Sequence, residues 1–372
     1  MQMINSKNKK KIVFYCATHP FEFHYKIARL FKKNGYETIL FTMSEKDRFD
    51  SNFYSEGFDK IICSNFQFYK PGLKTIPYSI KRGFSLFKFL IYLRCLKPYA
   101  VIGISGANWQ LRLVHKYFFN KYPFIYFPYD ILSNSFSSEE EARKEGLKDF
   151  EKNAEKYCFE NSDGIIHKGP SYELEFVKKI SRKELKLQKL QLSFMPYCSK
   201  EFIVPINKDK LSKIDKEIHL VIIGNVPNEP LSKKALYDFL ESAFKQKIHS
   251  HFYVKVSHIS KKDEEDYIKN LFGDYHKSRF FHLHNQLEPK EIVKEISKYD
   301  FSLWMSYGKD IPEVKFSIGN RIASYLEAGI PIIVDERAIF LNKLMSSYGL
   351  KLSFNKKNIK NLGKKLNKLD YK

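Results

Sequence analysis

The stretch Lys11–Thr42 reads KIVFYCATHPFEFHYKIARLFKKNGYETILFT and contains one complete strand–helix–strand pattern. Lys11–Ala17 is a short run rich in apolar residues, which favours a strand. His24–Asn34 repeats its apolar residues at helical spacing and ends at Gly35, a natural helix stop. Thr38–Thr42 is the next apolar run. Two strands joined by a helix predict a parallel sheet, because a helical crossover places the second strand beside the first in the same direction.

The same alternation continues through the rest of the chain and predicts an α/β protein. A capping box, Ser137 followed by Glu140, opens a polar helical stretch that runs towards Glu160. No repeat of 20–50 residues interrupts the pattern. Further strands are predicted at Tyr99–Ile104, Pro123–Tyr129, Gly164–His167, Ile218–Ile223, Phe252–Val256, Phe280–His284, Phe301–Met305, Ile330–Val334 and Leu350–Phe354.

A break in this pattern divides the chain. Between Met195 and Lys216 two prolines and several lysines follow neither helical nor strand periodicity, which indicates a linker. A chain of 372 residues is long enough for two buried cores. We therefore expect an N-terminal domain at 1–195, a linker at 196–216 and a C-terminal domain at 217–372.

Composition is that of an ordinary globular protein, with 43% hydrophobic and 28% charged residues. No run approaches the roughly 18 apolar residues that a membrane-spanning helix needs. The five cysteines are scattered and never form a CxxC pair, which is typical of reduced thiols. These features predict a cytoplasmic protein.

The net charge of +22 predicts an anionic partner. Residues 60–129 contain no Asp or Glu, and between 60 and 121 basic residues alternate with aromatic and aliphatic ones. Such a stretch could lie on an anionic membrane surface, at the inner membrane face, with each cation adding about 1 kcal/mol. It could equally be a core helix whose lysines point to solvent. No helix-turn-helix, zinc-finger or RNP pattern supports nucleic acid as the partner.

Several motifs are absent, which excludes common enzyme classes. The turn after the first strand is Cys16–Pro20 and carries no GxGxxG, so a dinucleotide dehydrogenase is disfavoured. There is no GxxxxGK[ST] and no GxSxG. The pairs His249/His251 and His282/His284 each place two imidazoles on one face of a strand, which a metal could use. Packing or surface histidines are the alternative, and because the sequence offers no third ligand we predict no metal.

The segment Glu313–Val334 reads EVKFSIGNRIASYLEAGIPIIV and predicts a loop, a helix that starts near Gly319, and a buried strand. Asn320 and Arg321 fall in the first turn of this helix. Free backbone N–H groups and the helix dipole favour a phosphate there, and an arginine adds a bidentate donor. In an open parallel sheet such a site lies at the carboxyl ends of the strands. The alternative is an ordinary helix with a surface arginine.

This segment resembles the donor-binding signature of GT-B glycosyltransferases, in particular the large retaining family of bacterial polysaccharide glycosyltransferases. Members of that family carry a pattern similar to P-x-K-x-x-E-Y-x-A-x-G-x-P-V-I. The pieces Asn34–Leu40 and Met195–Cys198 are also similar to parts of that family. The resemblance implies two Rossmann-like domains whose parallel sheets face each other across a cleft. The N-terminal domain would take the acceptor, and the C-terminal domain would bind the nucleotide sugar.

Residue roles follow from the resemblance. Arg321 takes the place of the basic residue that holds the donor diphosphate, and Gly224 with Asn225 matches the family's glycine loop. The family's glutamate near the ribose falls on Ser324, with Glu327 one turn away, and its acceptor-side histidine falls on Tyr129. Donor contacts are therefore expected from Gly224, Asn225, Lys234, Glu313, Gly319, Asn320, Arg321, Ser324 and Glu327.

The function implied is transfer of a sugar from a nucleoside-diphosphate sugar to a hydroxyl acceptor, such as a lipid-linked or cell-surface glycan. Neither a metal nor another cofactor is expected. Asp130 and His19 each follow a predicted strand of the N-terminal domain. They are the candidates for proton transfer on the acceptor side. Alternatively, Asp130 caps the residues that follow it, and His19 positions the loop before Pro20. A nucleotide-sugar epimerase of the same build and a catalytically silent membrane-surface scaffold remain as alternative functions.

Overall fold

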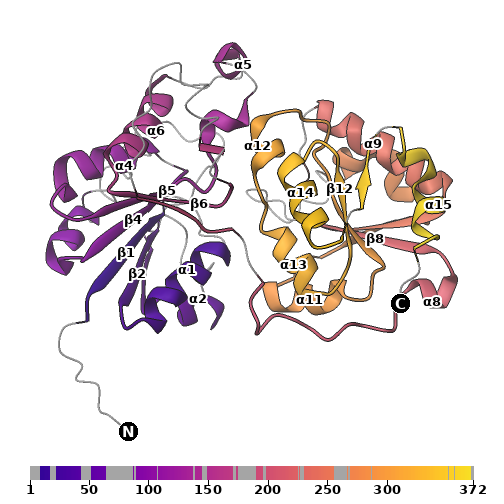
Figure 1. The fold of residues 1–372 in the computed structure, drawn as a ribbon, viewed down its shortest axis with the longest axis horizontal. Coiled ribbons are helices and arrows are strands. Elements are labelled where there is room, and N and C mark those ends of the chain that lie inside the picture. Colours follow the sequence, from indigo (N-terminus) through magenta and orange to yellow (C-terminus); the bar gives the residue numbers. More distant parts are fainter. Residues whose placement is uncertain are drawn as a thin grey trace, which may run out of the picture. The chain divides into compact units, whose positions relative to one another are not determined.

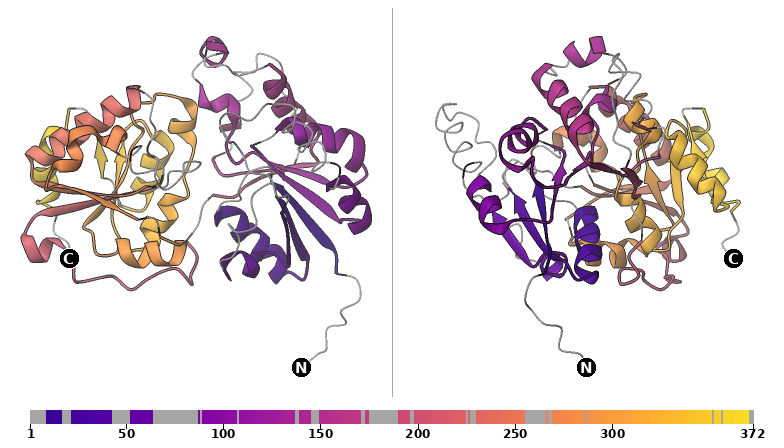
Figure 2. Two further views of the ribbon diagram at one scale, coloured as in Figure 1. Left: turned by 180° about the vertical axis from the view of Figure 1, so that it is seen from behind. Right: turned by 60° about the vertical axis from the view of Figure 1, so that its left-hand side comes forward.

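A computed structural model shows that the chain forms two compact units, Met1–Met195 and Pro196–Lys372. In each unit a parallel β-sheet has helices on both faces (Figure 1 and Figure 2). The structure describes residues 9–16, 22–42, 52–63, 87, 89–106, 108–136, 139–144, 149–170, 173–174, 190–195, 198–224, 226, 230–254, 266, 269–285, 287–350, 352–355 and 357–369.

The first unit contains a seven-stranded sheet in the order β3-β2-β1-β4-β5-β6-β7. All its strand pairs are parallel, and the order reverses between β1 and β4, which lie side by side. This is the strand order of a doubly wound nucleotide-binding fold with one strand added at the edge. The strands are β1 (Lys11–Cys16), β2 (Glu37–Thr42), β3 (Lys60–Cys63), β4 (Ala100–Ile104), β5 (Phe124–Phe127), β6 (Gly164–His167) and β7 (Leu190–Ser193).

Helices of the first unit bury one apolar side each against the sheet. Ile27 of α1 packs on one face, and Leu111 of α4 with Phe159 of α6 pack on the other. The helices are α1 (Glu22–Lys33), α2 (Asn52–Gly57), α4 (Asn108–Val114), the π-helical turn η2 (His115–Phe119), the 3-10 turn η3 (Leu132–Ser135), α5 (Glu139–Lys144) and α6 (Asp149–Asn161).

The second unit repeats the arrangement with six strands in the order β10-β9-β8-β11-β12-β13. All its strand pairs are parallel, and the order reverses between β8 and β11. The strands are β8 (Ile218–Ile223), β9 (Ile248–Tyr253), β10 (Phe281–His284), β11 (Phe301–Trp304), β12 (Ile332–Asp335) and β13 (Ser353–Phe354).

Two separate clusters of apolar side chains cover the two faces of this sheet. Leu236 of α9 and Leu362 of α15 belong to one cluster, and Val293 of α11, Ile322 of α13 and Leu341 of α14 belong to the other. The helices are α8 (Ser212–Asp215), α9 (Pro230–Lys245), η4 (Gly273–Lys277), α11 (Pro289–Ile296), α12 (Pro312–Phe316), α13 (Arg321–Glu327), α14 (Ile339–Ser347), η5 (Ile359–Asn361) and α15 (Leu362–Leu366).

The predicted elements agree with the structure where the apolar pattern is clean. β6 and β8 have the predicted bounds. β9 begins at Ile248 instead of Phe252, because two histidines interrupt the apolar run there. The edge strands β3 and β7 were not predicted, since neither is fully buried. The helix expected to run towards Glu160 is described as α5 and α6; residues 145–148 between them and the capping residue Ser137 lie outside the described residues.

The segment expected to be a linker is packed against the second unit in its described part. The backbone N–H groups of Val204 and Leu211 donate to the carbonyls of Glu327 and Lys298 at 3.0 Å. Lys210 Nζ donates to the carbonyl of Tyr299 at 2.9 Å. A stretch without periodicity is therefore held in place by hydrogen bonds to its neighbours, which composition alone does not reveal.

The basic stretch from 60 to 121 is described only in part, and residues 64–86 and 88 lie outside the described residues. Phe89 and Leu93 are buried in the core of the first unit, as the core-helix interpretation predicts. Ile91 and Phe87 are exposed. None of the described helices is both long and apolar enough to cross a bilayer.

Candidate functional site

The site in the second unit lies where two neighbouring strands end and their connections diverge. Gly224 follows β8 with a φ of 93°, and Tyr307 and Gly308 follow β11 with φ values of 52° and 80°. These left-handed conformations turn the backbone sharply directly after each strand. Because the strand order reverses between β8 and β11, the two connections lead to opposite faces of the sheet. This is the place at which open parallel sheets bind ligands.

Two glycine backbones come close to the guanidinium of Arg321. A Cβ atom on Gly224 would lie 3.9 Å from Cζ of Arg321, and one on Gly319 would lie 3.8 Å from its Nε. Among the described residues, only atoms of Arg321 lie within 4 Å of a Cβ placed on Gly224. The structure therefore brings together three residues that the sequence predicts to contact the donor, although Gly224 and Arg321 are almost 100 positions apart.

Polar atoms around Arg321 are buried and unsatisfied. Nη1 of Arg321 and Oδ1 of Asn320 make no hydrogen bond within the described part of the chain. Burial raises the pKa of the Tyr307 phenol, and the positive charge of Arg321 opposes this effect. A buried donor without a partner costs about 1–3 kcal/mol, and more when it is charged. The arrangement therefore fits a ligand that supplies negatively charged oxygen atoms.

Tyr325, on the same helix as Arg321, ties the ends of the two strands together. Its hydroxyl accepts a hydrogen bond from the N–H of Ile223 at 3.0 Å and donates to the carbonyl of Leu303 at 3.3 Å. Burial raises the pKa of Tyr325 to about 12, so the phenol keeps its proton. Helix α13 is thereby fixed to β8 and β11, and this holds Arg321 at the carboxyl edge of the sheet.

A second polar group at this edge was not predicted. Asp335 ends β12, and its Oδ2 accepts a hydrogen bond from the N–H of Ser306 at 3.3 Å as well as one from the Ser306 hydroxyl. Nη1 of Arg337 lies 3.3 Å from the same oxygen. Asp335 directly follows the predicted strand Ile330–Val334, and an acidic residue at the end of a buried strand is the signal that could have found it.

Other residues predicted to contact the donor lie on the helices around this edge. Lys234 is exposed in the first turn of α9, next to Ala235, whose Cβ would be 3.2 Å from a Cβ on Gly308. Glu313 is half-buried in α12, and Ser324 is buried in α13. Asn225 lies outside the described residues. Donor contacts by these side chains stay predictions.

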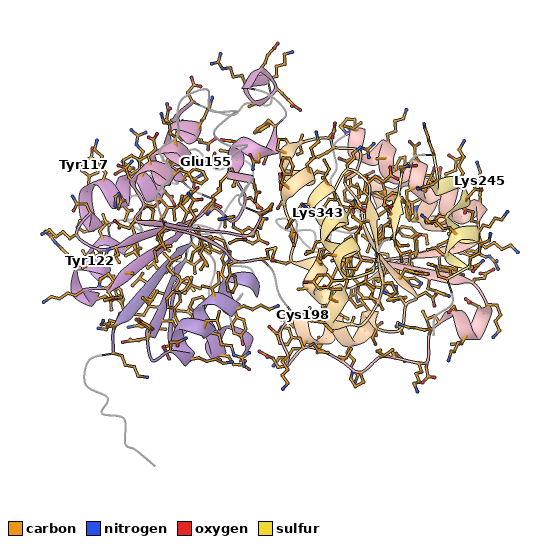
Figure 3. The ribbon with its side chains drawn as sticks, viewed as in Figure 1. Tyr117, Tyr122, Glu155, Cys198, Lys245 and Lys343 are labelled. Carbon is orange, nitrogen blue, oxygen red and sulfur yellow. The ribbon has the colours of Figure 1, made fainter. Side chains whose placement is uncertain are left out.

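Glu327 has a structural role that the sequence did not reveal. It is fully buried at the last turn of α13, whereas Arg321 starts that helix. Oε1 of Glu327 accepts a hydrogen bond from the N–H of Ser199 at 2.7 Å. Cys198, labelled in Figure 3, precedes this residue and contacts the carbonyl of Ala323 through its sulfur at 3.7 Å. Glu327 thus holds the segment after Cys198 on the helix, and its predicted contact with the donor stays a prediction.

A separate polar group lies at the carboxyl edge of the first sheet. Asp130 follows β5, and its Oδ1 lies 2.6 Å from Nζ of Lys168, which follows β6. The N–H of Asp130 donates to the hydroxyl of Ser105, which follows β4, at 3.2 Å. The side chain of Lys168 is only 7% exposed and its Nζ lies 4.1 Å from the centre of the Tyr129 ring, whereas the Asp130 side chain is 54% exposed. Lys168 was not predicted as a site residue, although it directly follows a predicted strand, in the sequence Lys-Gly-Pro.

The alternative role for Asp130, as a helix cap, belongs instead to another carboxylate. No side chain caps η3 from the residue that precedes it. Glu155 of α6, labelled in Figure 3, accepts hydrogen bonds from the N–H groups of Leu132 at 2.6 Å and Ser133 at 3.1 Å. The Asp130 carboxylate is therefore not used as the cap. His19, the other predicted proton carrier, lies outside the described residues.

Comparison with known proteins finds likeness in structure but not in sequence. No family model matches the chain, and no curated protein matches it significantly. Sucrose-phosphate synthase from Thermosynechococcus elongatus has a TM-score of 0.62 at 12% identity, covering 96% of this chain and 95% of that chain. Anabaena HepE in complex with UDP-glucose has a TM-score of 0.61 at 10% identity, covering 96% and 88%. A UDP-N-acetylglucosamine 2-epimerase has a TM-score of 0.53 at 11% identity, covering 97% and 88%.

These likenesses span nearly the whole chain, so both units take part in them. The glycosyltransferases among the similar structures have two Rossmann-like domains, as this chain does. At such low sequence identity the likeness shows the fold alone.

Proposed function

We propose that this chain, which has the GT-B fold of its glycosyltransferase neighbours, transfers a sugar from a nucleoside-diphosphate sugar to a hydroxyl acceptor. The observation that carries the proposal is the buried, unpartnered Nη1 of Arg321, placed against Gly224 at the point where the strand order reverses. A diphosphate supplies the anionic oxygens that this guanidinium lacks. The glycines let such a ligand approach the backbone without a side chain in the way.

The proposed chemistry at this site is stabilisation of the leaving group. As the bond between the sugar and the diphosphate breaks, negative charge grows on the diphosphate oxygens. Arg321 is held in position by its helix, which Tyr325 fixes to both strands, so little reorganisation is needed when the charge develops. In a partly buried site a charge-assisted hydrogen bond is stronger than in water. We propose that this transfer requires no metal.

On the acceptor side, Asp130 is proposed to take the proton from the attacking hydroxyl. Its carboxylate is half exposed, and the buried ammonium of Lys168 orients it through one oxygen. The second carboxylate oxygen is then available to an acceptor. Lys168 acts as a positioning residue in this proposal. His19 remains a second candidate for the proton transfer.

The neighbours suggest which donor to test first. HepE is described in complex with UDP-glucose, so UDP-glucose is the first candidate here as well. An epimerase reaction is the second candidate function, because UDP-N-acetylglucosamine 2-epimerase structures also match the fold. An epimerase would rearrange its sugar nucleotide without any acceptor. The two reactions are therefore separated by their dependence on an added acceptor.

A lipid-linked acceptor at the inner membrane face is part of the proposal. Phe87, Ile91 and Tyr117 expose large apolar surfaces in the first unit, and Arg94 and Lys116 lie close to them in the chain. Exposed aromatic residues among cations suit the surface of an anionic bilayer. Binding to anionic vesicles should weaken steeply with salt, and binding that ignores salt would contradict this part of the proposal.

The decisive experiment is a panel of UDP-, GDP- and ADP-linked hexoses. One class should raise the melting temperature of the protein and be hydrolysed slowly, releasing free nucleoside diphosphate. Arg321→Ala should lose both effects, whereas Lys343→Ala, a change on α14 labelled in Figure 3, should keep them. If no donor binds, or if Arg321→Ala binds its donor as the wild type does, the proposal fails. Conversion to a rearranged sugar nucleotide in the absence of acceptor would support the epimerase instead.

A further inference from the structure

Five histidines gather on three neighbouring strands of the second sheet. His219 is the second residue of β8, His249 and His251 belong to β9, and His282 and His284 belong to β10. The strand register places His219 beside His249, and His251 beside His282. Three of the five, His219, His249 and His282, are the second residues of their parallel strands, so this part of the cluster lies towards the edge opposite to Gly224 and Arg321.

Each histidine is connected to the next, and both series begin at a carboxylate. Asp215 Oδ2 lies 2.9 Å from Nε2 of His219, and His219 Nδ1 lies 2.9 Å from Nε2 of His251. Glu217 Oε2 lies 2.7 Å from Nε2 of His249, and Nδ1 of the same ring lies 2.8 Å from a neighbouring histidine on β10. The two carboxylates stand immediately before β8.

Burial makes this arrangement unusual. His219, His249 and His251 are all less than 10% exposed, at positions where a parallel sheet covered by helices normally carries Val, Ile or Leu. Imidazoles at such positions are desolvated and must satisfy every nitrogen, which apolar side chains need not do. The two hydrogen-bonded series supply these partners, and the same set of imidazole and carboxylate groups is one that a divalent transition metal binds.

We infer that Asp215, His219 and His249, with Glu217 beside His249, form a binding site for one divalent transition-metal ion of the Zn²⁺ type. One ligand atom from Asp215, His219 and His249 lies within 4.8 Å of both others. In a tetrahedral zinc site with bonds of about 2.0–2.1 Å the ligand atoms are about 3.3 Å apart. The observed separations bracket this value, at 2.9 and 3.7 Å from Asp215 Oδ2 to the two Nε2 atoms and 2.7 Å from Glu217 Oε2 to His249 Nε2.

Charge and side-chain geometry also suit such an ion. Two carboxylates and two neutral imidazoles balance a doubly positive ion, and the other oxygen of Glu217 is held by Arg279 at 3.0 Å. The rings of His219 and His249 stack in parallel, 4.4 Å apart. Both must therefore tilt towards a common point to share an ion, which is a rotation of side chains and requires no change of the sheet.

The remaining histidines lie where the hydrogen-bond partners of metal-binding histidines are expected. A ligand that binds a metal through Nε2 carries its proton on Nδ1 and donates it to an acceptor. Nδ1 of His219 faces His251, and Nδ1 of His249 faces His282. His251 in turn contacts His284 through its own Nδ1 at 2.9 Å. Metal binding would replace the two carboxylate–histidine hydrogen bonds by coordination and reverse the direction of the histidine–histidine hydrogen bonds that follow, so that each nitrogen stays satisfied.

An ion here would act on structure and not on sugar transfer, because it lies at the opposite edge of the sheet from Arg321. It would join the turn that carries Asp215 and Glu217 to the first residues of β8 and β9. The inference therefore does not depend on the proposed function.

The test is direct metal binding by the full chain. Protein stripped with a chelator is titrated with Co²⁺, whose visible absorption reports tetrahedral coordination, and with Zn²⁺ by calorimetry and thermal melting. We expect one equivalent to bind and to raise the melting temperature. Asp215→Asn should abolish binding and leave the sheet folded, since this carboxylate is partly exposed. His282→Gln should weaken it by about 10- to 100-fold, as the loss of a supporting hydrogen bond does.

His276→Gln is the control, because His276 is an exposed histidine of the same unit outside the cluster. It should bind metal as the wild type does. Absence of binding to the stripped wild-type protein, or binding that Asp215→Asn and His282→Gln leave unchanged, would overturn the inference. The cluster would then be a metal-free hydrogen-bond network.

Discussion

Replacing Arg321 with alanine tests the proposed donor site most directly. The substitution removes a guanidinium whose Nη1 is buried without a hydrogen bond in the described part of the chain and whose Cζ would lie 3.9 Å from a Cβ on Gly224. In the donor complex we expect it to make a bidentate contact with the diphosphate. A hydrogen bond to a charged group contributes about 1.5–3 kcal/mol. Donor affinity should therefore fall by about 10- to 150-fold.

The same geometry predicts how two further measurements respond. Arg321→Lys should recover only part of the affinity, because an ammonium cannot make two parallel hydrogen bonds. Turnover of Arg321→Ala should fall by more than affinity, since the charge on the leaving diphosphate is greatest in the transition state. Stability should change little, because the substitution breaks no hydrogen bond of Nη1 and removes a buried charge.

The assay is calorimetric donor titration beside a melting curve for each variant, with Lys343→Ala as the matched control. Unchanged donor affinity in Arg321→Ala would refute the reasoning, because the diphosphate would then bind elsewhere. A large drop in melting temperature would show instead that Arg321 supports the fold.

Three further predictions concern other parts of the molecule. Gly224→Ala should cost about 1–3 kcal/mol of stability, measured by denaturant unfolding, because its φ of 93° strains any residue with a Cβ; an unchanged midpoint would contradict this. Asp130→Asn should lower kcat by about 10²- to 10⁴-fold with donor affinity intact. Lys168→Met should shift the pH profile of kcat. A loss of donor affinity as large as the loss of kcat would indicate a structural role instead. Burial lowers the pKa of His115 in the folded protein below its usual value of 6.5. As the pH falls below about 6.5, the unfolded chain takes up a proton at this histidine before the folded protein does, so the free energy of unfolding decreases. Unfolding free energies at about pH 7.5 and about pH 5.5 should therefore differ less in His115→Gln than in the wild type, and equal differences would contradict the assignment.

Much of the fold could be predicted because its signals are short-range. β6 and β8 are uninterrupted apolar runs, and their bounds follow from the sequence directly. Prediction was least accurate where buried positions carry polar residues. The start of β9 was placed four residues late, because His249 and His251 occupy positions that a parallel sheet normally fills with aliphatic side chains.

The candidate site was predictable only in part. Arg321 and Gly319 lie in one segment whose pattern marks an anion site, and the structure places both beside Gly224. Glu327 belongs to the same segment, yet it is buried against Ser199. It lies six residues after Arg321, about one and two-thirds turns of helix, so its side chain leaves the helix on another face. Helical spacing gives the direction of a side chain, but not what lies there.

From the sequence alone the parallel sheets and most of their strands could be predicted, because these signals depend on residues within a few positions of one another. Contacts across each sheet depended on the tertiary structure, which pairs Lys168 with Asp130 and places His219 against His251. Lys168 and Asp130 are 38 positions apart, and His219 and His251 are 32 apart. The physical reason is that strand order and register set these neighbours, and both result from packing of the whole sheet.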